Sequence, residues 1–468
     1  MFALLAKFLT LVVFVWGLRR YLSKRDIDNI PGPEPESFFK GNMAQMFNTS
    51  SAGWNFNSMI SERYGRVARV WGLFGSKYLE IYDPKALHHI LVKDQVIYEE
   101  TSSFFASNAI MFGQGLLSTQ GEQHKKQRKM LNPVFSIAYM RNMVPMFNDI
   151  AKKLEKAIKN KLAHGTQEVD VLHWMSRAAL EMIGQSGLGY SFDPLVEGSM
   201  PHPFSEAAKA FTPTTSKMSL EIQFLLPILV KIGSPKFRRW LVDHFPSKRL
   251  RAIRDIIDIW DRTTTEIFEA KKRALKEGDE ALAQQIGQAK DLMSILTEYD
   301  DDRTFAFAAT DTTSNALSRT LHLLSLHPEI QERLRSEVIE ARKLHNGDIP
   351  YDDLVSLPFM DAVCRETLRL HAPVPRVIRV ARKDVILPLS TPIKGIDGRE
   401  MDSILVPNNT KIFIAILNAN RDPLLWGADA LEWKPERWLA PIPEALHEAH
   451  MPGIYSHLSV WPGVANRN

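Results

Sequence analysis

The sequence predicts a mainly helical domain with a small β-sheet, preceded by one N-terminal membrane-anchor helix. Three observations predict this architecture. Amphipathic helical patterns separated by proline and glycine fill residues 137–300, strand patterns are confined to residues 64–83 and to the region beyond residue 377, and an apolar run occupies residues 1–18. The 468 residues, 45% of them hydrophobic and 24% charged, are enough to bury a sizeable core.

The charge and cysteine content exclude two classes of protein. The net charge is only +4, and four basic residues cluster just after the apolar run, so the rest of the chain is nearly balanced. A nucleic-acid-binding protein would carry a larger basic surface. Cys364 is the single cysteine, so an intrachain disulfide is impossible, which suits a reducing, cytosol-facing compartment.

The N-terminal region predicts attachment to a membrane. Residues 1–20 are assigned as the anchor, which spans a bilayer if Lys7 extends its charge to the surface. The basic residues that follow place the rest of the chain on the cytoplasmic side. Residues 21–35 form a basic, proline-containing linker, and residues 36–468 form the main domain. A signal peptide and a buried core helix are the alternatives for the first segment.

The strand signals are few and local. Residues 64–83 predict two short strands joined through Gly72 and Gly75, and residues 411–417 predict another buried strand. A further apolar segment, residues 224–230, is flanked by lysines. We expect it to belong to the core, with contact at a membrane surface as the alternative.

A basic helix is predicted to begin at Gly121. His124 and Arg128 lie four residues apart in it and therefore share one face. Spacing alone favours a solvated basic face over an anion-binding pair.

Residues 304–328 predict a helix that ends at Pro328 and carries an acid and hydroxyl groups in an otherwise apolar setting. Ala308 and Ala309 leave room for a group to lie against the helix, and Asp311 and Thr312 follow directly. A threonine within a helix usually bonds to its own backbone. Beside small residues and an acid, it could instead relay protons to a bound ligand.

A charged pair in an apolar helix is the feature around which the chain is organised. Glu366 and Arg369 lie three residues apart within residues 361–370, so they share one helical face. A buried ion pair is costly unless further hydrogen bonds satisfy it. The pair therefore predicts a fixed polar network. Residues 420–438, rich in proline, tryptophan and charge, form a loop of the kind that needs fixed hydrogen bonds.

Taken in this order, these motifs resemble the cytochrome P450 family of haem-thiolate monooxygenases, of the microsomal eukaryotic type. The resemblance covers nearly the whole chain from the Pro-Gly-Pro linker onward. It implies oxidation of an apolar small molecule with haem, dioxygen and electrons from a membrane-bound reductase. It also implies attachment to the membrane of the endoplasmic reticulum with the domain facing the cytosol.

The resemblance assigns roles residue by residue. Glu366 and Arg369 match the family's Glu-x-x-Arg, which locks with an arginine of the Pro-Glu-Arg-Trp loop, here Arg437. Asp311 and Thr312 match the proton-delivery positions of the oxygen-activation motif. The residues that match partners of the haem propionates are His124, Arg128 and Arg379. With the family in view, the anion-binding interpretation of the basic helix becomes the better one.

Three departures from the family pattern stand out. Ala309 replaces a usual glycine, and only residues 304–310 of the central helix precede Asp311, about 10 Å of helix. The family's axial cysteine is missing, so no metal ligand is assigned. Cys364 is expected to be a buried structural thiol rather than a ligand. His457 could ligate iron, although a loop residue is the commoner role for such a histidine.

The missing cysteine leads to two hypotheses. In the first, the sequence is an incomplete product of a working monooxygenase, lacking the haem-binding loop and the following helix, and is inactive as written. In the second, it is a non-catalytic, membrane-anchored relative that binds an apolar ligand or a partner.

Overall fold

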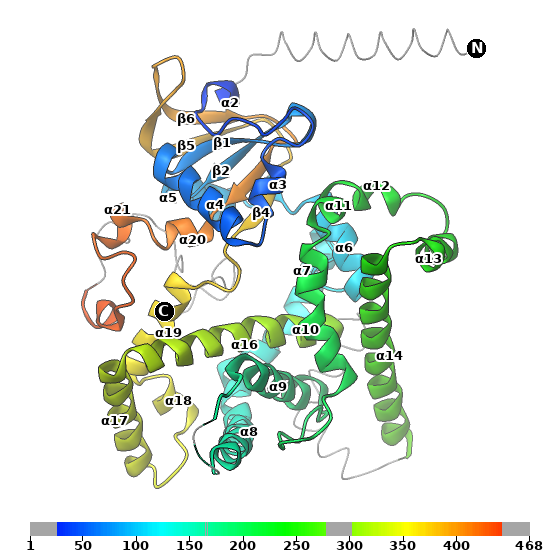
Figure 1. The fold of residues 1–468 in the computed structure, drawn as a ribbon, viewed down its shortest axis with the longest axis vertical. Helices are drawn as coiled ribbons and strands as arrows, with labels where there is room; N and C mark the ends of the chain where they lie inside the picture. Colours follow the sequence, from blue (N-terminus) through cyan, green and yellow to red (C-terminus); the bar gives the residue numbers. More distant parts are fainter. Residues whose placement is uncertain (1–25, 164, 166, 278–301, 442–468) are drawn as a thin grey trace.

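The computed structural model describes most of the chain (Figure 1): residues 26–163, 165, 167–277 and 302–441. The predicted anchor at residues 1–20 and His457 lie outside the described residues. Within the described ranges, no helix is both long enough and apolar enough to cross a membrane.

Helices dominate the described chain, as predicted. The helices of the first part are α2 (Asp26–Asn29), α3 (Met43–Met46), α4 (Ser51–Tyr64), α5 (Pro84–His88), α6 (Ser102–Phe112), α7 (Gly121–Leu131), α8 (Ile137–Leu162) and α9 (Val171–Ile183). Those of the middle are α10 (Pro203–Ser216), α11 (Ser219–Phe224), α12 (Leu226–Leu229), α13 (Pro235–His244) and α14 (Lys248–Glu277). The last are α16 (Asp302–Leu326), α17 (Pro328–Leu344), α18 (Tyr351–Leu354), α19 (Pro358–Leu370), α20 (Ile416–Ala419), α21 (Pro423–Trp426) and the 3-10 turn η5 (Pro435–Leu439).

Helix starts follow ordinary capping chemistry. The side chains of Thr101, Ser136 and Asp170 each accept a hydrogen bond from a backbone N–H in the first turn of α6, α8 and α9. Pro328 opens α17 and so separates it from α16, because proline fits the first turn of a helix but not its interior. The predicted stop of the central helix at Pro328 is confirmed.

Two small sheets make up the β part. The larger has the order β1-β2-β7-β4-β3, and the smaller pairs β5 with β6. The strands are β1 (Val67–Trp71), β2 (Lys77–Ile81), β3 (Tyr98–Glu99), β4 (Val377–Ala381), β5 (Val385–Lys394), β6 (Glu400–Val406) and β7 (Lys411–Ile414). The predicted hairpin is confirmed as β1 and β2. The strand predicted at residues 411–417 ends earlier, at Ile414, because α20 begins two residues later.

The sheets and the short helices α2 to α5 form one part of the molecule, and the long helices form the other (Figure 1). α16 crosses the helical part and packs against α9, α10, α14, α17 and α19. An aromatic cluster fills the space between α6, α10, α14 and α16. Its centre is Trp260, which is fully buried, with ring centroids 5.0 Å from Phe211 and 5.4 Å from Phe307. This cluster fixes α10 against α16.

The prediction that residues 224–230 belong to the core is wrong for most of that segment. Leu225, Ile228 and Leu229 are exposed, because α11 to α13 lie over the outside of the helical part with one side uncovered. Phe224 is partly buried and packs against the cluster that includes Phe413 of the sheet.

Candidate functional site

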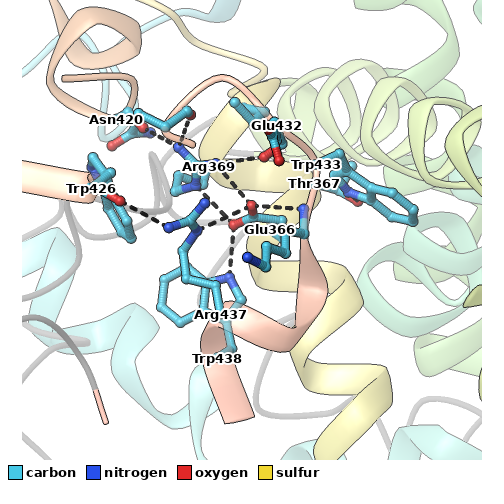
Figure 2. A network of polar contacts seen from close by, with 12 residues as sticks. Glu366, Thr367, Arg369, Asn420, Trp426, Glu432, Trp433, Arg437 and Trp438 are labelled. Atoms are coloured by element: carbon cyan, nitrogen blue, oxygen red, sulfur yellow. Dashed lines mark hydrogen bonds and ion pairs between the residues drawn. The ribbon is translucent and has the colours of Figure 1, made fainter. Parts of the chain in front are cut away.

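The Glu366 carboxylate is completely buried and accepts hydrogen bonds from several directions (Figure 2). Arg369 binds it in bidentate fashion, with Nε and Nη2 each 2.8 Å from a carboxylate oxygen. Three further donors come from the loop after α21: the backbone N–H of Lys434 at 3.1 Å, the indole Nε1 of Trp438 at 3.0 Å and Nε of Arg437 at 3.4 Å. The structure therefore brings Glu366, Arg369 and Arg437 together.

The two arginines also bind the backbone of residues 420–432, on both sides of α21. Arg369 donates to the carbonyl oxygens of Asn420 and Ala430, both at 2.7 Å, and to that of Glu432 at 3.2 Å. Arg437 donates to the carbonyls of Trp426 and Asp429 at 2.9 and 3.0 Å and pairs with the Asp429 carboxylate. Because each guanidinium has several partners, the buried charges are compensated.

The electrostatics agree with a carboxylate that stays ionised. Burial alone would raise the pKa of Glu366, but the hydrogen bonds and charge of Arg369, with the donors from Lys434 and Trp438, hold it below its ordinary value. The sign follows by linkage: the network contributes stability at neutral pH and loses it as the pH falls through the lowered pKa.

On α16, the predicted acid and threonine lie beside small residues. Ala308 is exposed, and Ala309, Asp311 and Thr312 are half-buried. The Thr312 hydroxyl donates to the carbonyl of Ala308 at 2.7 Å. Its hydrogen is therefore engaged, while its oxygen can still accept a hydrogen bond. Burial raises the pKa of Asp311, and hydrogen bonds from Thr212 and Asn315 partly offset the rise. A carboxyl of this kind holds a proton more readily than an ordinary aspartate.

The basic residues predicted to hold an anion lie on two elements. His124 and Arg128 are half-buried on α7, while Lys125 and Lys126 face solvent. Burial lowers the pKa of His124, and the neighbouring charge of Arg128 lowers it further. Arg379, on β4, forms an ion pair with Glu100, and burial lowers its pKa.

The expectation that Cys364 is buried is wrong. Its helix, α19, turns Glu366 and Arg369 inward, and Cys364 lies on the opposite side, where it is exposed together with Arg365. Among the described residues, no three histidine, cysteine, aspartate or glutamate side chains are grouped so as to hold a metal ion.

Three partners of the predicted residues did not emerge from the sequence: Thr212, which donates to Asp311, Glu100, which pairs with Arg379, and Trp438, which donates to Glu366. Only Trp438 had a local signal, since it belongs to the tryptophan-rich loop that was expected to need fixed hydrogen bonds. Thr212 and Glu100 reach their partners through tertiary packing, which no local sequence pattern predicts.

Comparison with known proteins gives a uniform result. The family model for cytochrome P450 matches residues 31–452. The chain is 47% identical to cytochrome P450 monooxygenase 91 of Postia placenta, over 98% of this chain and 87% of that protein. It is 42% identical to a ganoderic acid synthetase of Ganoderma lucidum, over 96% of this chain and 85% of that one.

Proposed function

Because the chain belongs to the cytochrome P450 family, whose members are haem-dependent monooxygenases, we propose that this protein oxidises an apolar small molecule with electrons from a membrane-bound reductase. The single observation that carries the proposal is the α16 surface, where Asp311 and Thr312 lie beside small alanines. The comparisons do not favour the alternative, a non-catalytic relative, which rests only on the missing axial cysteine.

The described residues fit a haem in their chemistry. His124 and Arg128 are half-buried on α7, where burial and the Arg128 charge lower the pKa of His124. The carboxylates of a haem beside them would favour the protonated imidazole and would be bound by both side chains. Ala308 and Ala309 offer short side chains against which a flat ring can lie. When bound, the haem supplies the iron that activates dioxygen. We propose Arg379 as a third partner of the haem carboxylates. To bind them, Arg379 would give up part of its ion pair with Glu100.

Asp311 and Thr312 are proposed to move the protons that the reaction consumes. With a raised pKa, the Asp311 carboxyl can take up a proton from solvent and release it toward the alanine-lined surface. The Thr312 oxygen can accept a hydrogen bond from the group that carries this proton and so orient it, because its own hydrogen is donated to the Ala308 carbonyl. Glu366, Arg369 and Arg437 take no part in this transfer; we propose that they hold the α19 region and the following loop in one arrangement.

The test uses haem-loaded protein with a reductase, NADPH, labelled dioxygen and a series of apolar small molecules. We expect a product that carries one labelled oxygen atom. Asp311→Asn and Thr312→Val should lower product formation about 100-fold, the usual size of a lost proton-transfer group. Thr310→Val is the matched control, since this buried hydroxyl only bonds to Ala306 of its own helix. Full activity of both variants would refute the proposed roles.

Cys364 is proposed to have no part in binding iron. It lies on the outward side of α19, away from Glu366, and is exposed. Cys364→Ser should therefore leave the absorption spectrum of the reduced, carbon monoxide-treated protein unchanged. A shift of the Soret band in this variant would make Cys364 a ligand and refute the assignment.

We also propose that the protein contacts a membrane through α11 to α13. An outward group of large apolar side chains lies there: Leu225, Ile228, Leu229, Ile232, Phe237, Trp240, Leu241 and Phe245. Basic residues lie among them, including Lys236 and Arg239, which are exposed. Apolar and aromatic side chains combined with basic ones are typical of a surface that lies in the headgroup region of a bilayer. This location would suit a protein that takes up an apolar substrate.

Flotation with anionic phospholipid vesicles tests this surface. Protein lacking residues 1–25 is used, so that the predicted anchor contributes nothing. We expect binding that Ile228→Glu and Trp240→Glu reduce strongly. Leu344→Glu is the matched control, since Leu344 is 82% exposed at the end of α17, outside the proposed surface. Equal binding by all three variants would refute the surface, and absence of binding by the parent protein would leave membrane attachment to other parts of the chain.

A further inference from the structure

The side chain of Asp311 has a partner on a different helix. Its Oδ2 atom accepts a hydrogen bond of 3.3 Å from the hydroxyl of Thr212, which lies on α10. Its Oδ1 atom is 3.4 Å from Nδ2 of Asn315, one turn further along α16. The Asn315 amide is bound more closely to the Asp311 backbone carbonyl, at 2.7 Å. Among the described residues, Thr212 therefore links the carboxylate to another element.

A second contact lies directly beside this hydrogen bond. Phe211 precedes Thr212 on α10, and its ring lies 4.8 Å from that of Phe307, in an edge-to-face arrangement. Phe307 and Asp311 are four residues apart on α16 and so share one face. The two neighbouring residues of α10 thus hold two successive turns of α16, one through an apolar contact and the other through a hydrogen bond.

The chain of α10 is weakened just after these two residues. Pro213 lies inside the helix, where it has no N–H to donate to the carbonyl four residues earlier. Side-chain hydroxyl groups donate hydrogen bonds to backbone carbonyls around this point: Thr214 to that of Ala210 and Thr215 to that of Phe211. The end of α10 is therefore a place where small changes of helix direction cost little free energy. Thr212 directly precedes Pro213 and so lies where this part of the helix begins.

We propose that Thr212 is a positioning residue for Asp311: its hydroxyl holds the carboxyl on the α10 side of α16 and so couples the placement of α10 to that of the acid. The proposal rests on the proposed role of Asp311 in proton transfer. Thr212 remains exposed beside the acid, so it controls the acid without closing it off from solvent.

Charged groups of the surrounding helices are engaged elsewhere. Lys209 of α10 contacts Glu206 and His173, and Arg177 of α9 pairs with Asp193. The pKa of Asp311 is raised by burial and lowered by the hydrogen bonds from Thr212 and Asn315, with no charged side chain of the described residues among the causes. Removal of the Thr212 hydroxyl therefore acts on this acid directly.

The experiment is an infrared titration of the Asp311 carboxyl in the full protein. The band of the protonated carboxyl is assigned by its loss in Asp311→Asn. Thr212→Val keeps the shape of the side chain but removes the hydroxyl, and we expect the titration midpoint to rise by about half a pH unit, a small shift because a 3.3 Å bond is long. Thr212→Ser should restore the midpoint. Thr214→Val, which loses only a bond within α10, should leave it unchanged.

The pH dependence of product formation separates this inference from the proposed function. If Asp311 acts as described, Thr212→Val should move the alkaline limb of the rate profile by the same amount as the infrared midpoint. An infrared shift without a shift of the rate profile would uphold the contact and refute the role of Asp311. A Thr212→Val midpoint equal to that of the parent protein, with all variants folded, would overturn the inference.

Discussion

The Glu366 network and the Asp311 site each centre on a carboxylate within a helix, yet they are built in opposite ways. Glu366 is fully buried, ionised and held by donors that include a bidentate arginine at 2.8 Å. Asp311 is half-buried, has a raised pKa and is held by hydrogen bonds of 3.3 and 3.4 Å. The comparison teaches that a carboxylate that fastens the fold is saturated with partners, whereas the one proposed for proton transfer has few hydrogen bonds, and these are long.

The largest loss of stability is expected when the Glu366 network is broken. Glu366→Ala leaves the Arg369 charge buried without its counterion, which costs about 3–5 kcal/mol of unfolding free energy. Urea denaturation measures the loss. Glu332→Ala removes one side of the exposed pair with Arg335 and, as control, should cost below about 0.5 kcal/mol. Similar losses in the two variants would contradict the assignment of Glu366 as the main fastening point.

A neighbour of the network should give it a dependence on pH. Burial, together with the charges of Arg319 and Arg421, lowers the pKa of His371 to about 4. The unfolded chain therefore binds a proton that the folded chain rejects, so stability falls as the pH drops from about 6.5 to 4. We expect a loss of about 2 kcal/mol from this group, given its half-buried position.

His371→Gln removes this titration and should flatten the stability curve between those pH values. The matched control is His244→Gln, at an exposed position on α13, which should keep the slope of the parent protein. Identical slopes for the parent and His371→Gln would show that another group causes the acid loss.

A smaller loss of stability than that of Glu366→Ala is expected where one donor of the network is deleted. Trp438→Phe removes a hydrogen bond to an ionised carboxylate and should cost about 1.5–3 kcal/mol. Trp433→Phe removes an equivalent indole donor, but its acceptor is the neutral hydroxyl of Thr367, so the cost should be about 1 kcal/mol. Thermal unfolding ranks the two variants, and the reverse order would contradict the charged character of the Glu366 acceptor.

The smallest effect on stability is expected at the second site. Asp311→Asn replaces a carboxylate that burial disfavours, so the variant should be as stable as the parent protein at pH 7, or more stable by up to about 1 kcal/mol. This advantage should vanish below the ordinary aspartate pKa, where the carboxyl is protonated in both states. A large destabilisation at pH 7 would mean that Asp311 has a structural role like that of Glu366.

The sequence predicted the Glu366 network better than the surroundings of Asp311. Glu366 and Arg369 are three residues apart in one helix, and a loop rich in tryptophan and arginine follows, so local spacing and composition indicated the network. The partner of Asp311 could not be found in this way, because Thr212 is 99 positions away and reaches the acid through the packing of α10 on α16. The pairing of Arg379 with Glu100 escaped for the same reason.

Exposure was predicted least well. Leu225, Ile228 and Leu229 look like core residues in any local pattern, since apolar periodicity states which side chains share a face but not what covers that face. Cys364 was expected inside because a free cysteine is usually a buried structural thiol, and its neighbours Ala362 and Val363 are buried. The helix has only one inward side, however, and Glu366 and Arg369 lie on it.

The pairing of β2 with β7 has a consequence for synthesis of the protein. Leu79 is paired with Ile412, about 330 positions later in the chain. At about 5–20 residues per second, a ribosome needs roughly 17–67 seconds to cover that distance. During this time the β1–β2 hairpin has an open edge, which is a site for wrong pairing between nascent chains. Protection of residues 77–81 until β7 has been synthesised would therefore lower the chance of wrong pairing.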